Sequence, residues 1–298
     1  MHSKLIIIDG NAIMHRAFHA IPPLSTPTGE PINAVHGFVS MLLRVVQDLK
    51  PTHIAVCFDQ KEPTFRKKLL PSYQEQRPEM ASELSSQFEK VYKFLDASKI
   101  KIYGLSGYEA DDVIGTLTET LNPKSEILII TGDRDILQLV DDKRNIKLFM
   151  PIGGLANGQI FTEKETLVRM EVVPSQIPDL KSLIGDPSDN YKGVAGIGPK
   201  TAQTLLSKYK SKENIYKSLN EIPEKIREKL INGSKDCDMS YKLATIVRDV
   251  PVKFNFDDMN KWDLGNSNII KLFEQEFGFK TLTERVKKLN SEKQLQLI

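Results

Sequence analysis

The stretch Leu5-Ile6-Ile7-Ile8-Asp9-Gly10-Asn11 places four large apolar residues in a row and then stops at an aspartate, a glycine and an asparagine. A short, uninterrupted apolar run of this kind predicts a strand buried on both faces, as in a parallel sheet covered by helices. The pattern occurs twice more: Ile54 to Phe58 ends at Asp59, and Ile127 to Ile130 leads into Thr131-Gly132-Asp133-Arg134-Asp135. Helix-spaced segments separate the three runs. The sequence therefore predicts an α/β fold with a mainly parallel central sheet and helices on both faces.

The composition narrows the class of protein. Hydrophobic residues make up 40% and charged residues 27% of the 298 positions, which is typical of soluble globular proteins. The formal net charge is +2, so the total charge does not point to a partner. Cys57 and Cys237 lack the close spacing of a thiolate metal site or redox motif. No segment has the length of a membrane span or of a signal-peptide core, so we expect a reduced, cytoplasmic protein.

Acidic residues gather at the predicted carboxyl ends of the strands. A single aspartate after a strand is usually a turn or helix-cap residue. Here Asp9, Asp59 and Asp133 follow three strands whose carboxyl ends share one edge of the sheet, where ligand sites form. A further stretch, Gly107-Tyr108-Glu109-Ala110-Asp111-Asp112-Val113-Ile114-Gly115, puts three carboxylates at a predicted helix start. These charges repel one another unless a cation binds among them, so this edge predicts a cation site.

Two more aspartates lie in the turn-forming cluster Gly185-Asp186-Pro187-Ser188-Asp189-Asn190. The candidate carboxylates are therefore nine in number: Asp9, Asp59, Glu109, Asp111, Asp112, Asp133, Asp135, Asp186 and Asp189. Two divalent cations would balance four of these charges, with several carboxylates acting through water. No histidine or cysteine joins the pattern, so Mg²⁺ or Mn²⁺ is favoured over zinc. Such a two-metal site suits phosphodiester hydrolysis, in which one metal activates water and the other stabilises the leaving oxygen.

Basic and aromatic residues interleave between Lys61 and Arg77, and prolines discourage one long helix there. A charge run is usually a solvated face. Its position between two acid-bearing elements nevertheless favours a phosphate-binding flap.

After about Phe161 the strand signals fade, which predicts a second, helical domain. Its main motif is Gly193-Val194-Ala195-Gly196-Ile197-Gly198-Pro199-Lys200-Thr201-Ala202. The glycine spacing fits neither a P-loop nor a dinucleotide fingerprint. It fits a tight hairpin that presents backbone N–H groups and a helix start to a backbone phosphate, with Lys200 nearby. The alternative is a glycine turn between packed helices.

Taken together, these motifs resemble the 5′→3′ nuclease domain of bacterial DNA polymerase I and its free-standing relatives, within the flap endonuclease superfamily. The matching runs extend in the family's order from about Leu5 to Val252. The resemblance implies a PIN-like α/β nuclease domain over residues 1–172, with a gateway segment at about 61–100. It implies a helical domain over residues 173–298, with a helix–three-turn–helix DNA-binding motif at about 180–210.

The resemblance also implies residue roles. Asp9, Asp59, Glu109, Asp111 and Asp112 would form one metal group, and Asp133, Asp135, Asp186 and Asp189 the other, with Asp111 near both. Arg66 and Arg77 would contact the phosphate near the cut, Tyr73 and Phe18 would stack on bases, and K⁺ would bind the carbonyls of the glycine hairpin. The implied DNA-binding residues are Arg16, Phe18, Arg66, Lys67, Tyr73, Gln74, Arg77, Gly193, Gly196, Ile197, Gly198, Lys200 and Thr201.

The expected function is a Mg²⁺-dependent 5′→3′ exonuclease and 5′-flap endonuclease that leaves 5′-phosphates during primer removal and repair. Expected substrates are 5′ flaps, nicked or gapped duplexes and RNA primers on DNA, cut by a monomer with a functional link to polymerase and ligase. One departure concerns Gln74, because the family usually has lysine after the gateway tyrosine. Two alternatives therefore stay open: a DNA-junction binding protein with weakened catalysis, and a PIN-type ribonuclease. The sequence also leaves open whether the chain stands alone or belongs to a longer polymerase.

Overall fold

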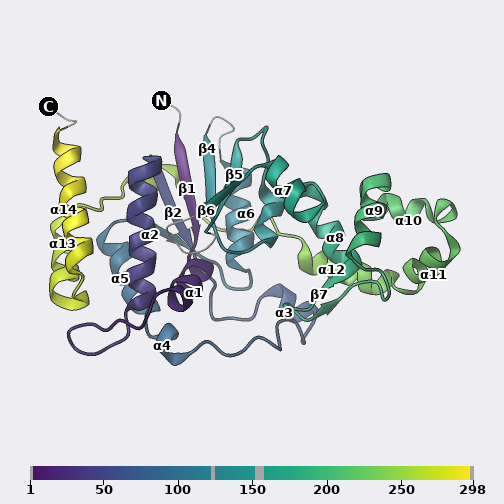
Figure 1. Ribbon diagram of the computed structural model, residues 1–298, viewed down its shortest axis with the longest axis horizontal. Helices are drawn as coiled ribbons and strands as arrows, with labels where there is room; N and C mark the ends of the chain where they lie inside the picture. Colours follow the sequence, from purple (N-terminus) through teal and green to yellow (C-terminus); the bar gives the residue numbers. More distant parts are fainter. Residues whose placement is uncertain (1–2, 122–124, 152–157, 296–298) are drawn as a thin grey trace.

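A six-stranded sheet forms the centre of the computed structural model, which describes residues 3–121, 125–151 and 158–295 (Figure 1). The strand order is β3-β2-β1-β4-β5-β6. The first five strands are parallel to their neighbours, and β6 pairs antiparallel with β5. The strands are β1 (Lys4–Asp9), β2 (His53–Cys57), β3 (Lys101–Tyr103), β4 (Glu126–Ile130), β5 (Ile146–Pro151) and β6 (Gly158–Phe161). The predicted α/β fold with a mainly parallel sheet is confirmed.

The two faces of the sheet are covered by different helices, because successive side chains of a strand point to opposite faces. Leu5 and Ile7 of β1 pack with α6 (Ala110–Thr120) on one face. Ile6 and Ile8 pack with the helices on the other face, α1 (Gly10–Ala20), α2 (Asn33–Leu49) and α5 (Phe88–Ala97). Burial on both sides explains why these strands are continuous apolar runs.

Register brings the strand ends together. Asp9 lies opposite Cys57 of β2, and Ile8 lies opposite Ile130 of β4. Asp59 and Thr131 therefore follow directly beside Asp9 at the carboxyl edge of the sheet, as the sequence predicted.

The gateway segment is shorter than predicted. It contains α3 (Phe65–Leu69) and α4 (Ser82–Ser85), which run along the lower edge of the molecule in Figure 1. The part from residue 88 onward is α5, whose Val91, Phe94 and Leu95 are fully buried against α2. The amphipathic spacing of α5 reflects core packing, so this helix belongs to the nuclease fold.

A helical lobe follows the sheet and lies at the right of Figure 1. Here α12 packs along α8, and a two-stranded ribbon of β7 and β8 lies beside them. The connection from the sheet is α7 (Glu163–Met170), which contacts β6. The elements of the lobe are α8 (Ile177–Ile184), β7 (Gly185–Asp186), β8 (Tyr191–Lys192), α9 (Pro199–Tyr209), α10 (Lys212–Lys217), α11 (Glu224–Asn232) and α12 (Ser234–Ala244). Short 3₁₀ helices complete the chain at Asp135–Leu139, Pro174–Gln176, Leu219–Glu221 and Phe256–Asn260.

The last helices, which fall within the predicted domain of residues 173–298, pack away from this lobe. The π-helical turn Leu272–Phe277, together with α13 (Ser267–Lys271) and α14 (Lys280–Leu295), packs against α2 and α5 on the far side of the sheet (Figure 1). Phe273 stacks on Phe94 of α5 with ring centroids 5.8 Å apart. Periodicity reveals that such a helix has an apolar face, but it does not reveal which surface that face covers. Among the described residues, no helix is long and apolar enough to cross a membrane.

Candidate active site

Seven of the nine predicted carboxylates line one cleft of about 700 Å³ at the carboxyl edge of the sheet. They are Asp9, Asp59, Glu109, Asp111, Asp133, Asp135 and Asp189. The gateway segment forms the opposite wall with Lys67, Tyr73, Gln74 and Arg77. Acids that are distant in the chain therefore meet the gateway segment in one cleft.

Asp9 and Asp59 are fixed by the starts of helices. Asp9 caps α1 by accepting a hydrogen bond from the N–H of Ala12 (3.0 Å), and it accepts another from Thr131 Oγ1 (2.6 Å). Asp59 accepts a hydrogen bond from the N–H of Ala110 at the start of α6 (2.7 Å). Burial raises the pKa of Asp9 to about 7 despite its two hydrogen bonds, and the charges of Asp59 and Asp133 add to the rise. Burial also raises the pKa of Asp59.

Glu109 and Asp111 belong to the acidic start of α6. Burial raises the pKa of Glu109 to about 7, although the nearby Arg66 opposes the shift. The pKa of Asp111 lies well above its usual value, first because of burial and then because of the charges of Asp133 and Asp9. A cation that binds here would displace the protons of Glu109 and Asp111. The donors here are all carboxylate oxygens, which suit hard ions such as Mg²⁺ or Mn²⁺.

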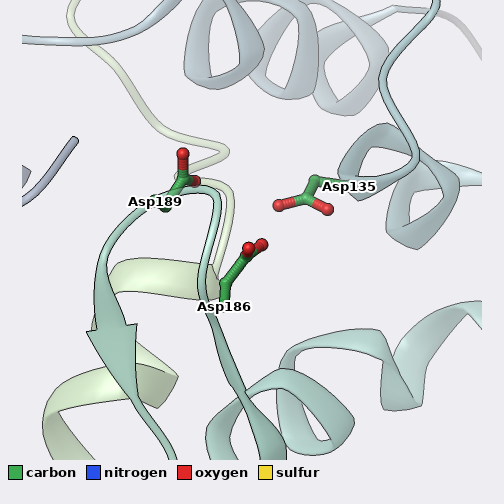
Figure 2. Close-up of side chains that lie close together, drawn as sticks. All are labelled: Asp135, Asp186 and Asp189. Carbon is green, nitrogen blue, oxygen red and sulfur yellow. The ribbon is translucent and has the colours of Figure 1, made fainter. Parts of the chain in front are cut away.

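A second cluster consists of Asp135, Asp186 and Asp189, which we call the Asp135 cluster. One carboxylate oxygen of each lies within 4.8 Å of the others, and Figure 2 shows the three side chains facing a common space. Asp186 ends β7 and Asp189 lies in the turn that follows it. Asp135 approaches from the loop after β4, where its N–H donates to Asp133 Oδ1 (2.8 Å). This is the spacing that a shared cation requires.

Lys181, which the sequence analysis did not select, supplies a positive charge to this cluster. Its ammonium group on α8 forms ion pairs with both Asp135 and Asp186, and its side chain is only 15% exposed. Burial disfavours the charged lysine, but Asp135 and Asp186 raise its pKa overall. Burial likewise opposes ionisation of Asp186, yet hydrogen bonds from Lys181 and Ser188 lower its pKa. A divalent cation that binds the three carboxylates would therefore compete with this ammonium group.

Asp112 and Arg66 pair with each other, which corrects the roles predicted for both. Arg66 donates two hydrogen bonds to Asp112 (2.6 and 2.8 Å) and others to the carbonyls of Leu243 (2.8 Å) and Thr245 (2.9 Å). Asp112 also accepts from the N–H groups of Glu109 and Val247 and is fully buried. With its acceptor positions filled, Asp112 has no lone pair directed at the cleft. Arg66 borders the cleft, but its side chain is only 3% exposed and its guanidinium is engaged by Asp112 and by Glu109 (3.3 Å).

The gateway segment closes on the Asp135 cluster. Arg77 pairs with Asp189 (2.5 Å), and Gln74 donates its side-chain N–H to the same carboxylate (3.3 Å) and its backbone N–H to the Asp189 carbonyl (2.9 Å). Tyr73 is 3% exposed and donates to Asp189 (3.2 Å) and Glu109 (3.4 Å). The Tyr73 ring, which was predicted to stack on bases, is buried in this arrangement. Gln74 faces the carboxylates, where the resemblance predicted a phosphate contact.

Three other predicted DNA-binding residues lie around this region. Lys67 lines the cleft and donates to the Tyr73 carbonyl (2.9 Å). Phe18 packs against the core on the α2 side, and its ring meets His19 edge-on. Arg16, also on α1, has a buried Nε without a hydrogen-bond partner among the described residues. Neither α1 residue lines the cleft.

The predicted glycine hairpin is present before α9. Gly196 has φ +79°, and a Cβ on Gly193 would lie 2.3 Å from the backbone N of Gly185, so the chain needs glycine at both positions. Ile197 is buried, and Gly198 precedes Pro199, the first residue of α9. No side chain caps this helix start, so the N–H groups of Lys200 and Thr201 are available to an anion.

The carbonyl at the hairpin tip, where K⁺ was predicted, already has a cationic neighbour. Lys229 of α11 donates a hydrogen bond from its ammonium group to the Gly196 carbonyl (3.0 Å). Its position 33 residues after Gly196 explains why the sequence motif did not include it.

Comparisons with known proteins agree with this geometry. Residues 4–171 match the family described as 5′–3′ exonuclease, N-terminal resolvase-like domain, and residues 172–267 match 5′–3′ exonuclease, C-terminal SAM fold. The chain is 36% identical to a 5′–3′ exonuclease of Aquifex aeolicus, covering 96% of both chains. It is 39% identical to DNA polymerase I of Caldicellulosiruptor bescii over 95% of this chain, but spans only 33% of that polymerase.

Solved structures share the fold. The bacteriophage T5 D15 flap endonuclease, in a complex with DNA and metal ions, superposes with a TM-score of 0.64 at 19% identity, over 97% of this chain and 98% of its own. The catalytic core of Rad2 in complex with a DNA substrate superposes with a TM-score of 0.60 at 15% identity, over 96% and 91%. Both domain models match in order and together extend from residue 4 to residue 267. The chain therefore belongs to the 5′–3′ exonuclease family.

Proposed function

We propose that this chain is a Mg²⁺- or Mn²⁺-dependent 5′→3′ exonuclease and 5′-flap endonuclease that cuts DNA and leaves 5′-phosphates. The observation that carries the proposal is the single cleft in which seven carboxylates from distant parts of the chain face the gateway segment. Family membership and the DNA-bound neighbours of the same fold support it.

The carboxylates fit two cations. Asp9, Asp59, Glu109 and Asp111 would hold one, and the Asp135 cluster would hold the other, with Asp111 and Asp133 between them. Bound there, the ions would supply an activated water and stabilise the charge on the leaving oxygen. The buried ion pair between Arg66 and Asp112 would hold the gateway segment against α6.

The chain's own residues would position the substrate. The glycine hairpin and Lys200 would bind the backbone of the duplex, since a helix start with free N–H groups attracts phosphate. Arg77 is 52% exposed at its side chain and could exchange Asp189 for a substrate phosphate while a cation binds the cluster. Lys67 lies beside it in the cleft wall and adds positive charge.

The direct test uses a 5′-flap duplex labelled at the flap end, with Mg²⁺ or Mn²⁺ titrated from zero. We expect metal-dependent release of short products bearing the 5′ label, and none in chelator. Asp111→Asn should lose cleavage but still bind the flap duplex in a gel-shift assay. Folded wild-type protein that cleaves at no divalent-metal concentration would refute the proposal.

Two arms address the alternatives. If the chain is a junction-binding protein weakened at Gln74, wild-type protein will bind flaps tightly with negligible turnover, and Gln74→Lys will raise the cleavage rate strongly. If it is a ribonuclease, an RNA flap on the same duplex will be cut in preference to the DNA flap. Competition between DNA and RNA flaps in one reaction distinguishes these outcomes from the proposed activity.

A further inference from the structure

Tyr191 lies next to the Asp135 cluster, and neither the motifs nor the family resemblance gave it a role. It is the first residue of β8 and pairs directly with Asp186 across the β7–β8 ribbon. Residues opposite each other in an antiparallel pair project from the same face of the ribbon. The chain therefore places a phenol beside one of the three carboxylates and two residues after another, Asp189.

The hydroxyl of Tyr191 has no hydrogen-bond partner among the described residues, although the side chain is only 4% exposed. Buried polar groups are almost always hydrogen-bonded, and an unpaired one destabilises the protein. The ring itself is well packed, because it stacks on Tyr73 with centroids 6.4 Å apart and planes 16° apart, beside Leu243 and Ala244. Phenylalanine would make the same packing contacts without the unpaired hydroxyl. The described protein atoms therefore leave the hydroxyl without a hydrogen-bond partner.

The surroundings identify the kind of partner. Asp186 lies opposite Tyr191 in the β7–β8 ribbon and Asp189 lies two residues before it, yet among the described residues the Tyr191 hydroxyl makes no hydrogen bond to a carboxylate. A divalent ion such as Mg²⁺ keeps several waters when it binds carboxylates, and those waters extend its coordination sphere outward. A water on such an ion would lie beside the phenol and donate a hydrogen bond to the Tyr191 oxygen.

We propose that Tyr191 is a positioning residue for the second cation, its hydroxyl oxygen accepting a hydrogen bond from a water carried by the ion of the Asp135 cluster. The inference rests on the metal site of the proposed function, and it adds a residue that acts through water. Outer partners of this kind orient metal-bound groups and contribute to metal affinity. Tyr73 of the gateway segment stacks on the Tyr191 ring and donates a hydrogen bond to Asp189. A movement of the gateway segment would therefore change the surroundings of Tyr191.

The experiment compares wild-type protein with Tyr191→Phe, which keeps the ring and removes only the hydroxyl. Mn²⁺ binding is measured by isothermal titration and by electron paramagnetic resonance counting of free ion. Asp189→Asn identifies which binding phase belongs to the Asp135 cluster. We expect Tyr191→Phe to weaken that phase by about five- to tenfold, the effect of one hydrogen bond, and to leave the other phase unchanged.

Thermal unfolding gives a second readout that a merely structural tyrosine would not produce. In chelator, Tyr191→Phe should unfold at the same temperature as wild type or higher, because an unpaired buried hydroxyl is removed. The rise in melting temperature on adding Mn²⁺ should be smaller than for wild type. Tyr216→Phe is the control, since Tyr216 donates to the Leu230 carbonyl (3.0 Å) within the helical lobe. It should lower the melting temperature in chelator and leave the Mn²⁺ response unchanged.

The outcomes separate the two proposals. If wild-type protein shows no binding phase that Asp189→Asn removes, the two-metal function fails and the role of Tyr191 fails with it. If wild type binds two ions and Tyr191→Phe binds both with unchanged affinity, only the role of Tyr191 is overturned. A Tyr191→Phe variant that melts well below wild type in chelator would also overturn it, because the hydroxyl would then have a partner within the protein.

Discussion

Replacing Asp112 by asparagine tests the assignment that differs most from the sequence prediction. Asp112 Oδ1 accepts hydrogen bonds from Arg66 (2.8 Å) and from the N–H of Val247 (2.9 Å). Its Oδ2 accepts from Arg66 (2.6 Å) and from the N–H of Glu109 (3.1 Å). Either orientation of an asparagine amide would direct its NH₂ group at two donors. The variant therefore breaks two hydrogen bonds and removes the bidentate carboxylate partner of the buried Arg66 guanidinium, which keeps only its 3.3 Å ion pair with Glu109.

The expected loss is large because Asp112 is fully buried and the Arg66 side chain is 3% exposed. Removing one partner of a buried, hydrogen-bonded ion pair typically costs about 3–5 kcal/mol of unfolding free energy. For a chain of this size, that corresponds to a decrease in melting temperature on the order of 10 °C. The double variant Arg66→Met, Asp112→Leu should recover part of the loss, since the guanidinium and the carboxylate that pair in the core are both removed.

The assay is urea unfolding in chelator, followed by far-ultraviolet circular dichroism, with Asp111→Asn as the matched control. Asp111 is the preceding residue, and burial and like charges raise its pKa. Its replacement removes repulsion, so metal-free Asp111→Asn should unfold at a higher urea concentration than wild type, whereas Asp112→Asn should unfold at a lower one. Opposite shifts of the urea midpoint for these two adjacent residues would show that Asp111 has no ion-pair partner and that Asp112 has one.

One result would refute this reasoning. If Asp112→Asn unfolds at the same urea concentration as wild type but no longer binds divalent metal, then Asp112 faces the cleft, as the family resemblance implied. The paired arrangement with Arg66 would then be wrong.

Three further predictions concern charge. Burial raises the pKa of Asp9 and of Glu109 to about 7 in the fold, against about 4 in an unfolded chain. Between pH 4 and 7 the metal-free folded protein binds more protons than the unfolded chain, so its unfolding free energy should fall as pH rises. Plotted against pH, the urea midpoint should fall less steeply for Asp9→Asn than for wild type. Arg77→Met removes a cation that pairs with Asp189, so titration should show the Asp135 cluster binding Mn²⁺ several-fold more tightly while flap cleavage falls. Lys229→Met should weaken duplex binding and reduce the salt-dependence slope by about one, compared with Lys225→Met on the same helix as the control.

The sequence predicted the parts of the fold that depend on local pattern. Strands β1, β2 and β4 are uninterrupted apolar runs because both of their faces are covered, and each was predicted from that run alone. Strand β3 was missed because it has three residues, two of them exposed at the sheet edge. The position of α13 and α14 was missed for another reason. Their apolar residues indicate a buried face, but long-range packing decides whether that face covers the helical lobe or the sheet.

The limits of prediction within the site are also physical. Asp111 and Asp112 are adjacent, so on a helix their side chains point about 100° apart. One consequently lines the cleft and the other turns to Arg66, although the sequence motif treats them alike. Lys181 and Tyr191 lie just outside the aspartates that the motif selects, and their roles depend on contacts across α8 and the β7–β8 ribbon.

The distribution of positive charge suggests why the two halves of the site differ. The Asp135 cluster contacts two cations of the protein itself, Lys181 within it and Arg77 above it. In the described residues, Asp9, Asp59 and Asp111 have no ion pair, and burial raises the pKa of each. A metal ion that binds Asp9, Asp59 and Asp111 displaces no ion pair among the described residues, whereas an ion that binds the cluster competes with Lys181 and with Arg77, which holds the gateway segment. The two ions should therefore differ in affinity, and binding of the weaker one should be coupled to release of the gateway. This coupling would connect arrival of a phosphate at Arg77 with completion of the metal site.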